Sequence, residues 1–139
     1  MLTALIAPFR SPEVQVTTLA HPLSAKEALQ PDRVKVVMGR DNRALYFSRL
    51  PIPYPHDGRE GSYHGHIGIY AFRMKTLEQF VALEEGILEQ MESLEQLRLL
   101  ENNIPIHVVL TSHKSHGVDR PEDIAVVEEI LKKKEQDCP

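Results

Sequence analysis

The sequence has little cysteine and no long hydrophobic run, and both absences limit what the protein can be. The single cysteine, Cys138, lies beside the carboxyl end, so no disulfide can form within the chain. A lone thiol suits a reducing compartment, and the expected location is the cytoplasm. No apolar run approaches the roughly 20 residues that a helix needs to cross a bilayer, so no membrane span is predicted. Residues 1–7 are apolar but lack preceding basic residues, which argues against a secretory signal and favours the tail of a helix.

A basic surface and the usual nucleophile motifs are also missing. The formal net charge is -4, and apart from residues 132–134 the lysines and arginines are scattered, so nucleic-acid binding is not expected. No serine occupies a Gly-x-Ser-x-Gly turn, and no glycine-rich, basic segment that would hold nucleotide phosphates occurs in the chain. The sequence therefore predicts neither nucleophilic catalysis nor a complete nucleotide site.

The composition is that of an ordinary globular domain. The chain has 139 residues, of which 42% are apolar and 26% charged, and we expect a single domain over residues 1–139. A domain of this length buries roughly two-thirds of its unfolded surface, so it needs neither disulfides nor a structural metal to fold.

Local patterns predict strands mixed with helices. Ser24 followed by Glu27 has the form of a capping box, and Pro31 closes the short helix that it opens. Two extended runs around a polar turn predict a β-hairpin over residues 33–48. Residues 50–63 are too rich in proline and glycine for a regular helix. Further strands are predicted at 14–19, 67–72 and 104–110, helices at 76–83 and 88–101, and a closing helix after Pro121 with Ile124, Val127, Ile130 and Leu131 on its buried face.

This order of elements indicates an α/β sheet domain rather than a sandwich or a bundle. The run from Ile67 to Phe72 is nearly all apolar, which is typical of a strand buried on both faces. The order fits half of an α/β fold, whose cut edge would leave strands without partners and so promote association.

Asp119 follows a strand and a loop and stands just ahead of the closing helix. A carboxylate at the carboxyl end of a sheet, beside a helix N-terminus, is placed where α/β folds bind ligands and can hold a magnesium ion. Taken alone, the same position is more typical of a residue that only caps the helix.

Glu92, Glu95 and Gln96 are spaced to share one polar side of a single helix over residues 88–101. The opposite side carries an apolar stripe of leucines together with Met91. The polar side is either a solvated face or a set of acceptors and an amide for a polyhydroxylated ligand such as a sugar.

Four other side chains invite a functional interpretation. His64 and His66 project to the same side of a strand, as zinc ligands can, but no third ligand is evident nearby and structural roles are favoured. Arg49 ends a strand and is suited either to bidentate recognition of a carboxylate or phosphate or to a surface ion pair. Tyr70 lies in an apolar strand and is expected in the core with its hydroxyl at the edge.

Taken in order, these segments resemble a known enzyme family. The segments are 44–49 (Ala-Leu-Tyr-Phe-Ser-Arg), 66–70 (His-Ile-Gly-Ile-Tyr), 92–98 (Glu-Ser-Leu-Glu-Gln-Leu-Arg) and 117–123 (Gly-Val-Asp-Arg-Pro-Glu-Asp). Their sequences and order closely resemble 3-deoxy-manno-octulosonate cytidylyltransferase, also called CMP-Kdo synthetase, over nearly the whole chain.

The resemblance implies a partial three-layer αβα fold with a mixed sheet like that of nucleotide-sugar transferases. The hairpin would serve as a dimerisation arm. In this family the first half of the domain carries the phosphate loop and another metal-binding aspartate. The resemblance therefore implies that the amino-terminal nucleotide-binding half is absent, that the chain is the carboxy-terminal half, and that it is inactive alone.

The resemblance also implies a reaction and its participants. A nucleotidyltransferase of this family moves CMP from CTP to Kdo, giving CMP-Kdo and pyrophosphate for lipopolysaccharide assembly, with Mg²⁺ as cofactor and a homodimer as the assembly. The anomeric hydroxyl of Kdo would attack the α-phosphorus of CTP while metal ions neutralise the developing charge. Asp119 would be the catalytic magnesium ligand. The Kdo pocket would be lined by Arg49, His66, Tyr70, Glu95 and Gln96.

Two positions depart from the family pattern. Gly65 stands where an arginine or another larger residue is usual, and Arg120 stands where threonine is common, which should weaken the cap of the closing helix by roughly 1 kcal/mol. Two alternatives stay open. One is a cytidylyltransferase for a related acidic sugar, 8-amino-Kdo or a sialic-acid relative, although the pair Glu95-Gln96 and Arg49 argue against the sialic-acid branch. The other is a non-catalytic fragment that binds sugar or dimerises.

Overall fold

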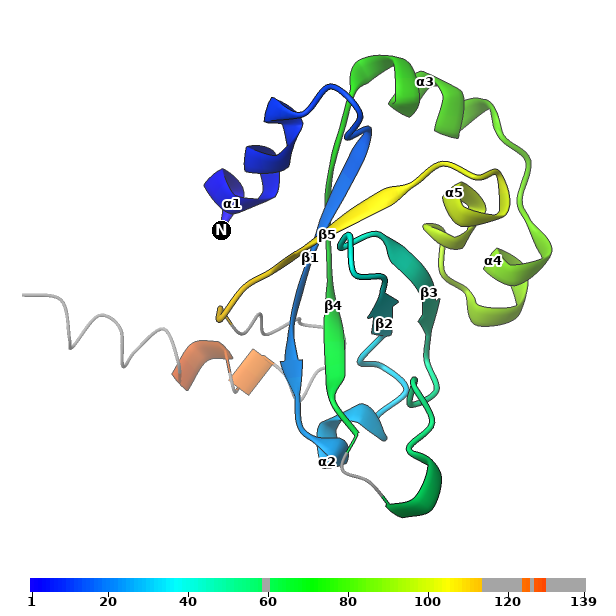
Figure 1. The fold of residues 1–139 in the computed structure, drawn as a ribbon. Coiled ribbons are helices and arrows are strands. Elements are labelled where there is room, and N and C mark those ends of the chain that lie inside the picture. The colour runs from blue at the N-terminus through cyan, green and yellow to red at the C-terminus, as the bar shows by residue number, and fades with distance from the viewer. Residues whose placement is uncertain (59–60, 114–123, 126, 130–139) are drawn as a thin grey trace, which may run out of the picture.

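The computed structural model describes residues 1–58, 61–113, 124–125 and 127–129, and within them helices lie on both sides of a five-stranded mixed sheet (Figure 1). The strands are β1 (Val16–Leu23), β2 (Lys35–Met38), β3 (Ala44–Ser48), β4 (Tyr63–Phe72) and β5 (Ile106–Leu110). The α-helices are α1 (Leu2–Ile6), α2 (Ala25–Ala28), α3 (Met74–Ala82), α4 (Ile87–Glu92) and α5 (Leu97–Glu101), and short 3-10 helices are η1 (Ala7–Arg10) and η2 (His56–Gly58). The predicted mixed α/β class is confirmed.

The sheet has the strand order β3-β2-β4-β1-β5. β1 pairs antiparallel with β4 and parallel with β5, and β2 pairs antiparallel with β3, which confirms the predicted hairpin. The hairpin joins the rest of the sheet where Lys35 of β2 lies opposite Gly65 of β4. Within the described residues, β3 and β5 are therefore the edge strands.

The turn of the hairpin reaches across to β5. Arg43 and His107 form an isolated antiparallel bridge, and the backbone N–H of Val108 donates to the carbonyl of Asn42 at 2.8 Å. Asn42 has φ 60°, a left-handed conformation that asparagine adopts more readily than most residues. The turn therefore links the two edge strands of the sheet.

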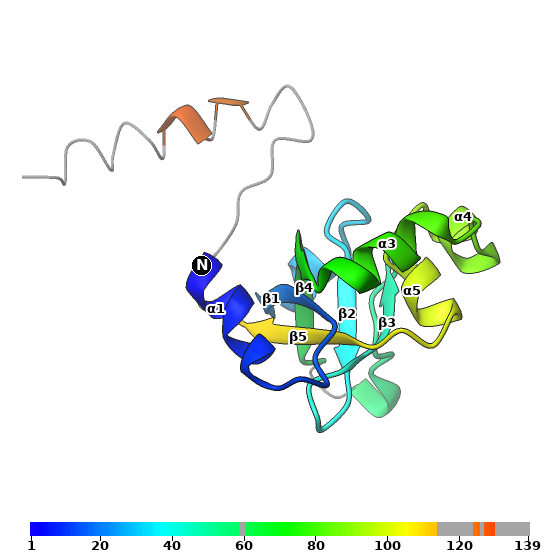
Figure 2. The same ribbon diagram turned by 90° about the horizontal axis from the view of Figure 1, so that it is seen from above.

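Apolar side chains fill the space on both faces of the sheet. On one face Phe47 and Ile106 pack with Leu97 of α5, and on the other Leu19 and Ile67 pack under Leu5 of α1. Figure 2 shows α1 on the side of the sheet opposite to α4 and α5. The two faces alternate along a strand because successive side chains point in opposite directions.

The short helix α2 forms as its sequence predicts. The Ser24 hydroxyl accepts from the backbone N–H of Glu27 at 3.3 Å, and the Glu27 carboxylate accepts from the backbone N–H of Ser24 at 2.9 Å. This exchange is a capping box, and α2 then ends at Ala28, ahead of Pro31.

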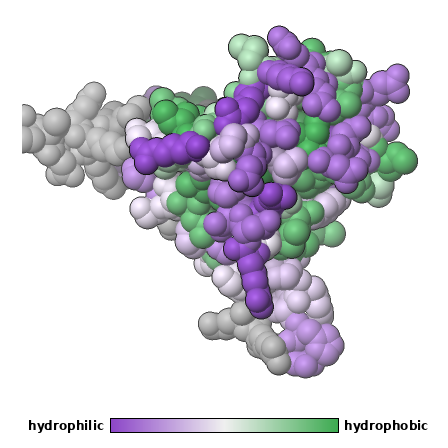
Figure 3. All heavy atoms as spheres, turned by 45° about the horizontal axis from the view of Figure 1, so that its top comes forward, coloured by the Kyte–Doolittle hydropathy of each residue, from purple (hydrophilic) through white to green (hydrophobic). Residues whose placement is uncertain are grey.

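The prediction of one continuous helix over residues 88–101 is wrong. α4 ends at Glu92, Ser93 adopts a left-handed conformation with φ 52° and ψ 53°, and α5 begins only at Leu97. The break turns α4 relative to α5, so Met91 of the predicted apolar stripe is 79% exposed while Leu97 is fully buried. Figure 3 shows apolar side chains at the surface on the side of the molecule that carries α4.

The remaining predictions differ mainly in their bounds. The first strand starts two positions later than predicted and runs on to Leu23. Burial of β4 on both faces is wrong at Gly68, which is exposed. Residues 124–125 and 127–129 are helical, as predicted for the closing helix, and the rest of that helix lies outside the described residues. No helix in the described part of the chain is long and apolar enough to cross a membrane.

Candidate functional site

β4 presents a row of ring side chains on the face that packs against α5. The ring of His66 lies 4.9 Å from that of Phe47 on β3 and 5.5 Å from that of Tyr70, measured between centroids. His66 and Tyr70 share this face because side chains alternate along a strand with a period of two. The row continues through Phe72, whose ring stacks on Phe80 of α3 at 5.8 Å.

A buried threonine fixes the tautomer of His66. The Oγ1 of Thr18, which is fully buried on β1, lies 2.9 Å from Nε2 of His66 and 2.9 Å from the carbonyl oxygen of Ile69. The hydroxyl has one proton to donate, and the carbonyls of Ile69 and Ile67, at 2.9 and 3.3 Å, can only accept. This arrangement favours a hydroxyl that donates to a carbonyl and accepts from Nε2–H of His66. The Nδ1 of His66 is left as a hydrogen-bond acceptor.

Burial sets the protonation of both polar rings. Desolvation lowers the pKa of His66 from 6.5 to about 4, so its imidazole is neutral at neutral pH. Desolvation, reinforced by the negative charge of Glu95, raises the pKa of Tyr70 above its ordinary value. The strand therefore offers a neutral imidazole and a protonated phenol.

Glu95 and Gln96 follow the left-handed Ser93 and lie at the start of α5. Glu95 is exposed, and its charge is close enough to affect Tyr70. Gln96 is only 6% exposed, and its buried Nε2 has no hydrogen-bond partner among the described residues. Since buried amide donors are nearly always satisfied, this one is suited to an acceptor on a ligand.

Glu92 does not belong with Glu95 and Gln96, and the predicted common polar side is wrong for it. Its carboxylate turns to β3 and accepts from the Ser48 hydroxyl at 2.7 Å and from the backbone N–H of Arg49 at 3.0 Å. The reason is the break at Ser93, which separates its helix from the segment that follows.

Arg49 points at the same break. Its Nε donates to the carbonyl of Glu92 at 2.7 Å and its Nη2 to the carbonyl of Ser93 at 3.1 Å. The ion pairs within the described residues do not involve Arg49, so the predicted surface ion pair is not formed there. Its role toward a sugar stays a prediction.

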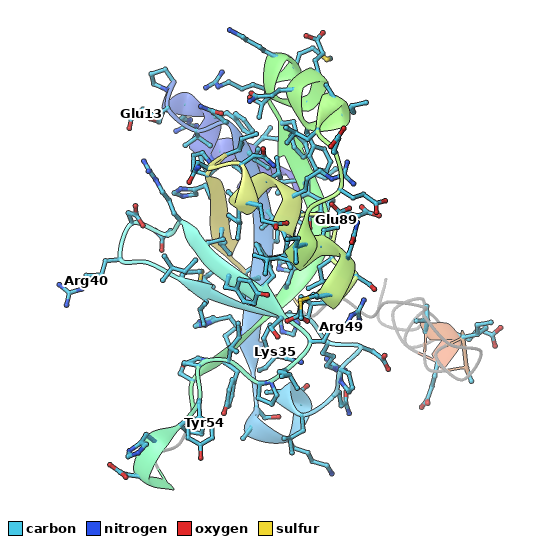
Figure 4. All side chains as sticks on the ribbon, turned by 90° about the vertical axis from the view of Figure 1, so that its right-hand side faces the viewer. Glu13, Lys35, Arg40, Arg49, Tyr54 and Glu89 are labelled. Carbon is cyan, nitrogen blue, oxygen red and sulfur yellow. The ribbon has the colours of Figure 1, made fainter. Side chains whose placement is uncertain are left out.

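Sequence reasoning missed Lys35, which is fully buried in β2. Its Nζ donates to the carbonyl of Gln30 at 3.0 Å and to the carbonyl of Arg49. Figure 4 shows the side chains of Lys35 and Arg49 near each other at the end of the hairpin. Burial lowers the pKa of Lys35, with Glu92 acting in the opposite direction. The only signal in the sequence was a lysine between the apolar Val34 and Val36 of a strand.

Metal binding cannot be assigned to the described residues. They contain no group of three or more histidine, cysteine, aspartate or glutamate side chains placed to hold an ion. Asp119, the predicted magnesium ligand, lies outside the described residues, as does the whole segment 117–123.

Comparison with known proteins places this arrangement in a family. A family model described as cytidylyltransferase matches residues 2–115, most of the chain. The chain belongs to the cytidylyltransferase family. Two curated cytidylyltransferases named 3-deoxy-manno-octulosonate cytidylyltransferase show how close the relation is. The protein of Nitratidesulfovibrio vulgaris strain DP4 is 55% identical over 136 residues, and that of Escherichia coli is 43% identical over 120 residues.

The match covers this chain far more completely than its relatives. The alignment takes in 95% of this chain but 54% of the Nitratidesulfovibrio cytidylyltransferase, and 86% against 49% for that of Escherichia coli. A solved CMP:2-keto-3-deoxy-manno-octonic acid synthetase complexed with CTP matches with a TM-score of 0.90 and 40% identity, over 96% of this chain and 56% of that one. The chain thus spans about half the length of the cytidylyltransferases it matches.

Proposed function

We propose that this chain supplies the sugar side of a cytidylyltransferase that moves CMP from CTP to Kdo, giving CMP-Kdo and pyrophosphate for lipopolysaccharide assembly. The names of its relatives and the CTP held by the solved synthetase support the two substrates. The observation that carries the proposal is the buried amide of Gln96, which lacks a partner among the described residues and directly follows Glu95, whose charge acts on Tyr70.

The polar groups around this amide are suited to a sugar. The Gln96 amide would donate to a sugar oxygen, the exposed Glu95 carboxylate would accept from hydroxyls, and Nδ1 of His66 would accept from another. Several directional hydrogen bonds made together fix the orientation of a polyhydroxylated ligand. Tyr70 keeps its proton, so its hydroxyl would both donate a hydrogen bond to the sugar and accept one from it.

In the proposed reaction the anomeric oxygen of Kdo forms a bond to the α-phosphorus of CTP as the bond to pyrophosphate breaks. The low pKa of His66, about 4, makes it a weak base at neutral pH, and the raised pKa of Tyr70 keeps the phenol protonated. Neither group suits the removal of the hydroxyl proton. The contribution of this chain is therefore to hold the sugar in position for attack.

Magnesium remains part of the proposal on the sequence alone. The described residues do not form a metal site by themselves. We propose Asp119 as a magnesium ligand, and the ion would neutralise charge on the phosphates. A chain that also carries the amino-terminal half found in the relatives should release pyrophosphate from CTP and Kdo with magnesium, and Asp119→Ala in that chain should abolish the release. Full activity in that variant would refute the ligand assignment.

The hairpin and the loop after it are proposed to form a homodimer contact. Leu45 is 63% exposed, Leu50 71% and Tyr54 81%, and Figure 4 shows Tyr54 carried out from the body by its loop. Large exposed apolar side chains in one region are typical of interaction surfaces. Sedimentation equilibrium should give a dimer for the chain and a monomer for Leu45→Asp, whereas a monomeric parent chain would refute the contact.

The central test is the binding of Kdo to this chain by isothermal titration calorimetry. We expect one site, and Gln96→Leu should weaken binding at least about tenfold because the sugar loses a buried donor. Gln90→Leu, on the exposed side of α4, is the matched control and should bind as the parent does. Absence of heat on adding Kdo would refute the proposal.

Calorimetry and the pyrophosphate-release assay together separate the alternatives. Tighter binding of 8-amino-Kdo than of Kdo would identify the related sugar as the substrate. Kdo binding without any CTP-dependent release of pyrophosphate would identify a sugar-binding fragment rather than a working transferase.

A further inference from the structure

Arg49 and Glu92 hold each other by exchanging side-chain and backbone contacts. The Arg49 guanidinium donates to the backbone carbonyl of Glu92 at 2.7 Å, while the Glu92 carboxylate accepts from the backbone N–H of Arg49 at 3.0 Å. The two residues lie 43 positions apart in the sequence. The end of β3 is thereby fixed to the end of α4.

Two contacts of the Arg49 guanidinium fall on groups that a helix end leaves without partners, and a third, longer one joins Nη1 to the carbonyl of Pro31 at 3.4 Å. The backbone N–H of Ser93 and that of Leu94 both turn back to the carbonyl of Glu89, which closes α4. The carbonyls of Glu92 and Ser93 come after that closure and have no helical donor. Arg49 supplies donors to both of them, with its Nη2 reaching Ser93 at 3.1 Å.

Arg49 is itself held rigidly. Its carbonyl accepts from the Nζ of the fully buried Lys35, and its backbone N–H is held by Glu92. Figure 4 shows Lys35 and Arg49 together where the hairpin meets the helices, far from Arg40 at the hairpin turn. A planar guanidinium on a fixed backbone can set the position of two carbonyls more tightly than a flexible ammonium could.

We propose that Arg49 is a positioning residue, which acts on the sugar by holding the left-handed turn at Ser93 and so placing Glu95 and Gln96. The turn is the only stretch between α4 and these two residues, and its left-handed conformation is unfavourable for serine unless surrounding contacts hold it. The inference rests on the proposed sugar site. It differs from direct recognition, in which Arg49 would pair with the sugar carboxylate.

The first test needs no ligand. Amide hydrogen exchange, followed by NMR on the chain of residues 1–139, reports the backbone hydrogen bonds of Leu94 and Leu97 on either side of the turn. Arg49→Lys should raise both exchange rates about tenfold, because a charged donor to the turn is lost. The matched control Arg40→Lys, in the exposed hairpin turn, should leave both rates unchanged.

The second test separates positioning from direct contact with the sugar. Calorimetry gives the Kd of the chain for Kdo and for Kdo methyl ester, which lacks the carboxylate charge. Positioning requires Arg49→Lys to weaken both by the same factor, about tenfold, so that their ratio stays that of the parent. If Arg49 paired directly with the sugar carboxylate, the ratio of the two Kd values would move toward one in Arg49→Lys. That result, or exchange rates equal to those of the parent, would overturn the proposal.

A milder variant guards against loss of folding. Glu92→Gln leaves the guanidinium in place and weakens the two contacts of the carboxylate, to the Arg49 backbone and to the Ser48 hydroxyl. The exchange rates of Leu94 and Leu97 should therefore rise by a smaller factor, about threefold. Unchanged rates in this variant would also overturn the proposal. If the parent chain binds no Kdo, the sugar site is refuted, and the exchange rates still decide whether Arg49 holds the turn.

Discussion

The hydroxyl of Thr18 lies 2.9 Å from Nε2 of His66 at the point where β1 and β4 shift register. The same hydroxyl donates to the carbonyl of Ile69 at 2.9 Å, which favours an imidazole that donates to the hydroxyl through Nε2–H. A histidine held in this way offers the site only an acceptor. Protonation would occur at Nδ1 and keep the contact to Thr18, so its cost is that of burying a charge.

The first prediction concerns pH. The pKa of His66 is about 4 in the folded chain against 6.5 when exposed, so between these values the unfolded state binds more protons. The free energy of unfolding should be fully retained above pH 6.5 and fall by at most about 3 kcal/mol as the pH drops to 4. Urea unfolding at several pH values measures this. His66→Gln removes the titrating ring, and a slope over this pH range equal to that of the parent would contradict the assignment.

The second prediction uses two glycines of β4. A Cβ built on Gly65 would meet Cδ1 and Cγ of Leu23 at 2.9 Å, whereas one built on Gly68 would meet nothing within 4 Å. Gly65→Ala should therefore destabilise the chain by about 1–3 kcal/mol through overpacking. Gly68→Ala should stabilise it by about 0.5 kcal/mol, because glycine weakens a strand. Equal effects in urea unfolding would show that Leu23 moves aside.

The third prediction concerns the ion pair of Glu89 and Arg98, which brackets the break in the helices. Nε of Arg98 donates to Oε2 of Glu89 at 2.6 Å, and both side chains are largely shielded, at 16% and 8% exposed. Arg98→Met leaves a shielded carboxylate without its partner, so it should cost at least about three times as much stability as Arg33→Met, whose pair with Glu27 is open to solvent. Thermal unfolding of both variants checks this, and similar losses would rule out a special role for the shielded pair.

The fourth prediction concerns the left-handed turn. Ser93 has φ 52°, a conformation in which glycine pays no steric penalty, so Ser93→Gly should stabilise the chain by about 0.5–1 kcal/mol. Ser11 has φ -83° and ψ 127°, and Ser11→Gly should destabilise the chain slightly because the unfolded state gains freedom. A loss of stability in Ser93→Gly, measured by urea unfolding, would mean that the serine side chain holds the turn.

The sequence predicted the local elements well because their causes are local. The capping box of Ser24 and Glu27 lies within one helical turn, and the hairpin depends on the polar residues between its own strands. The alternation along β4 likewise placed His66 and Tyr70 on one face. These features need no information from distant parts of the chain.

The break at Ser93 could not be predicted in this way. The leucine spacing from residue 88 to 101 fits one helix, and nothing in that segment shows that Arg49 would satisfy the carbonyls at its centre. The same distance along the chain hid the roles of Glu92 and Lys35, whose partners belong to other elements. Gln96 was identified as a candidate, but its burial became visible only once the helix was seen to end.

The contact between the hairpin turn and β5 also bears on how the chain behaves in concentrated solution. An edge strand recruits other chains through its outward N–H and C=O groups. In β5, the outward N–H of Val108, at the middle of the strand, is already taken by Asn42, and His107 is bridged to Arg43. A strand of another molecule that approached this edge would first have to displace the hairpin turn, so the hairpin opposes aggregation by addition of strands to β5.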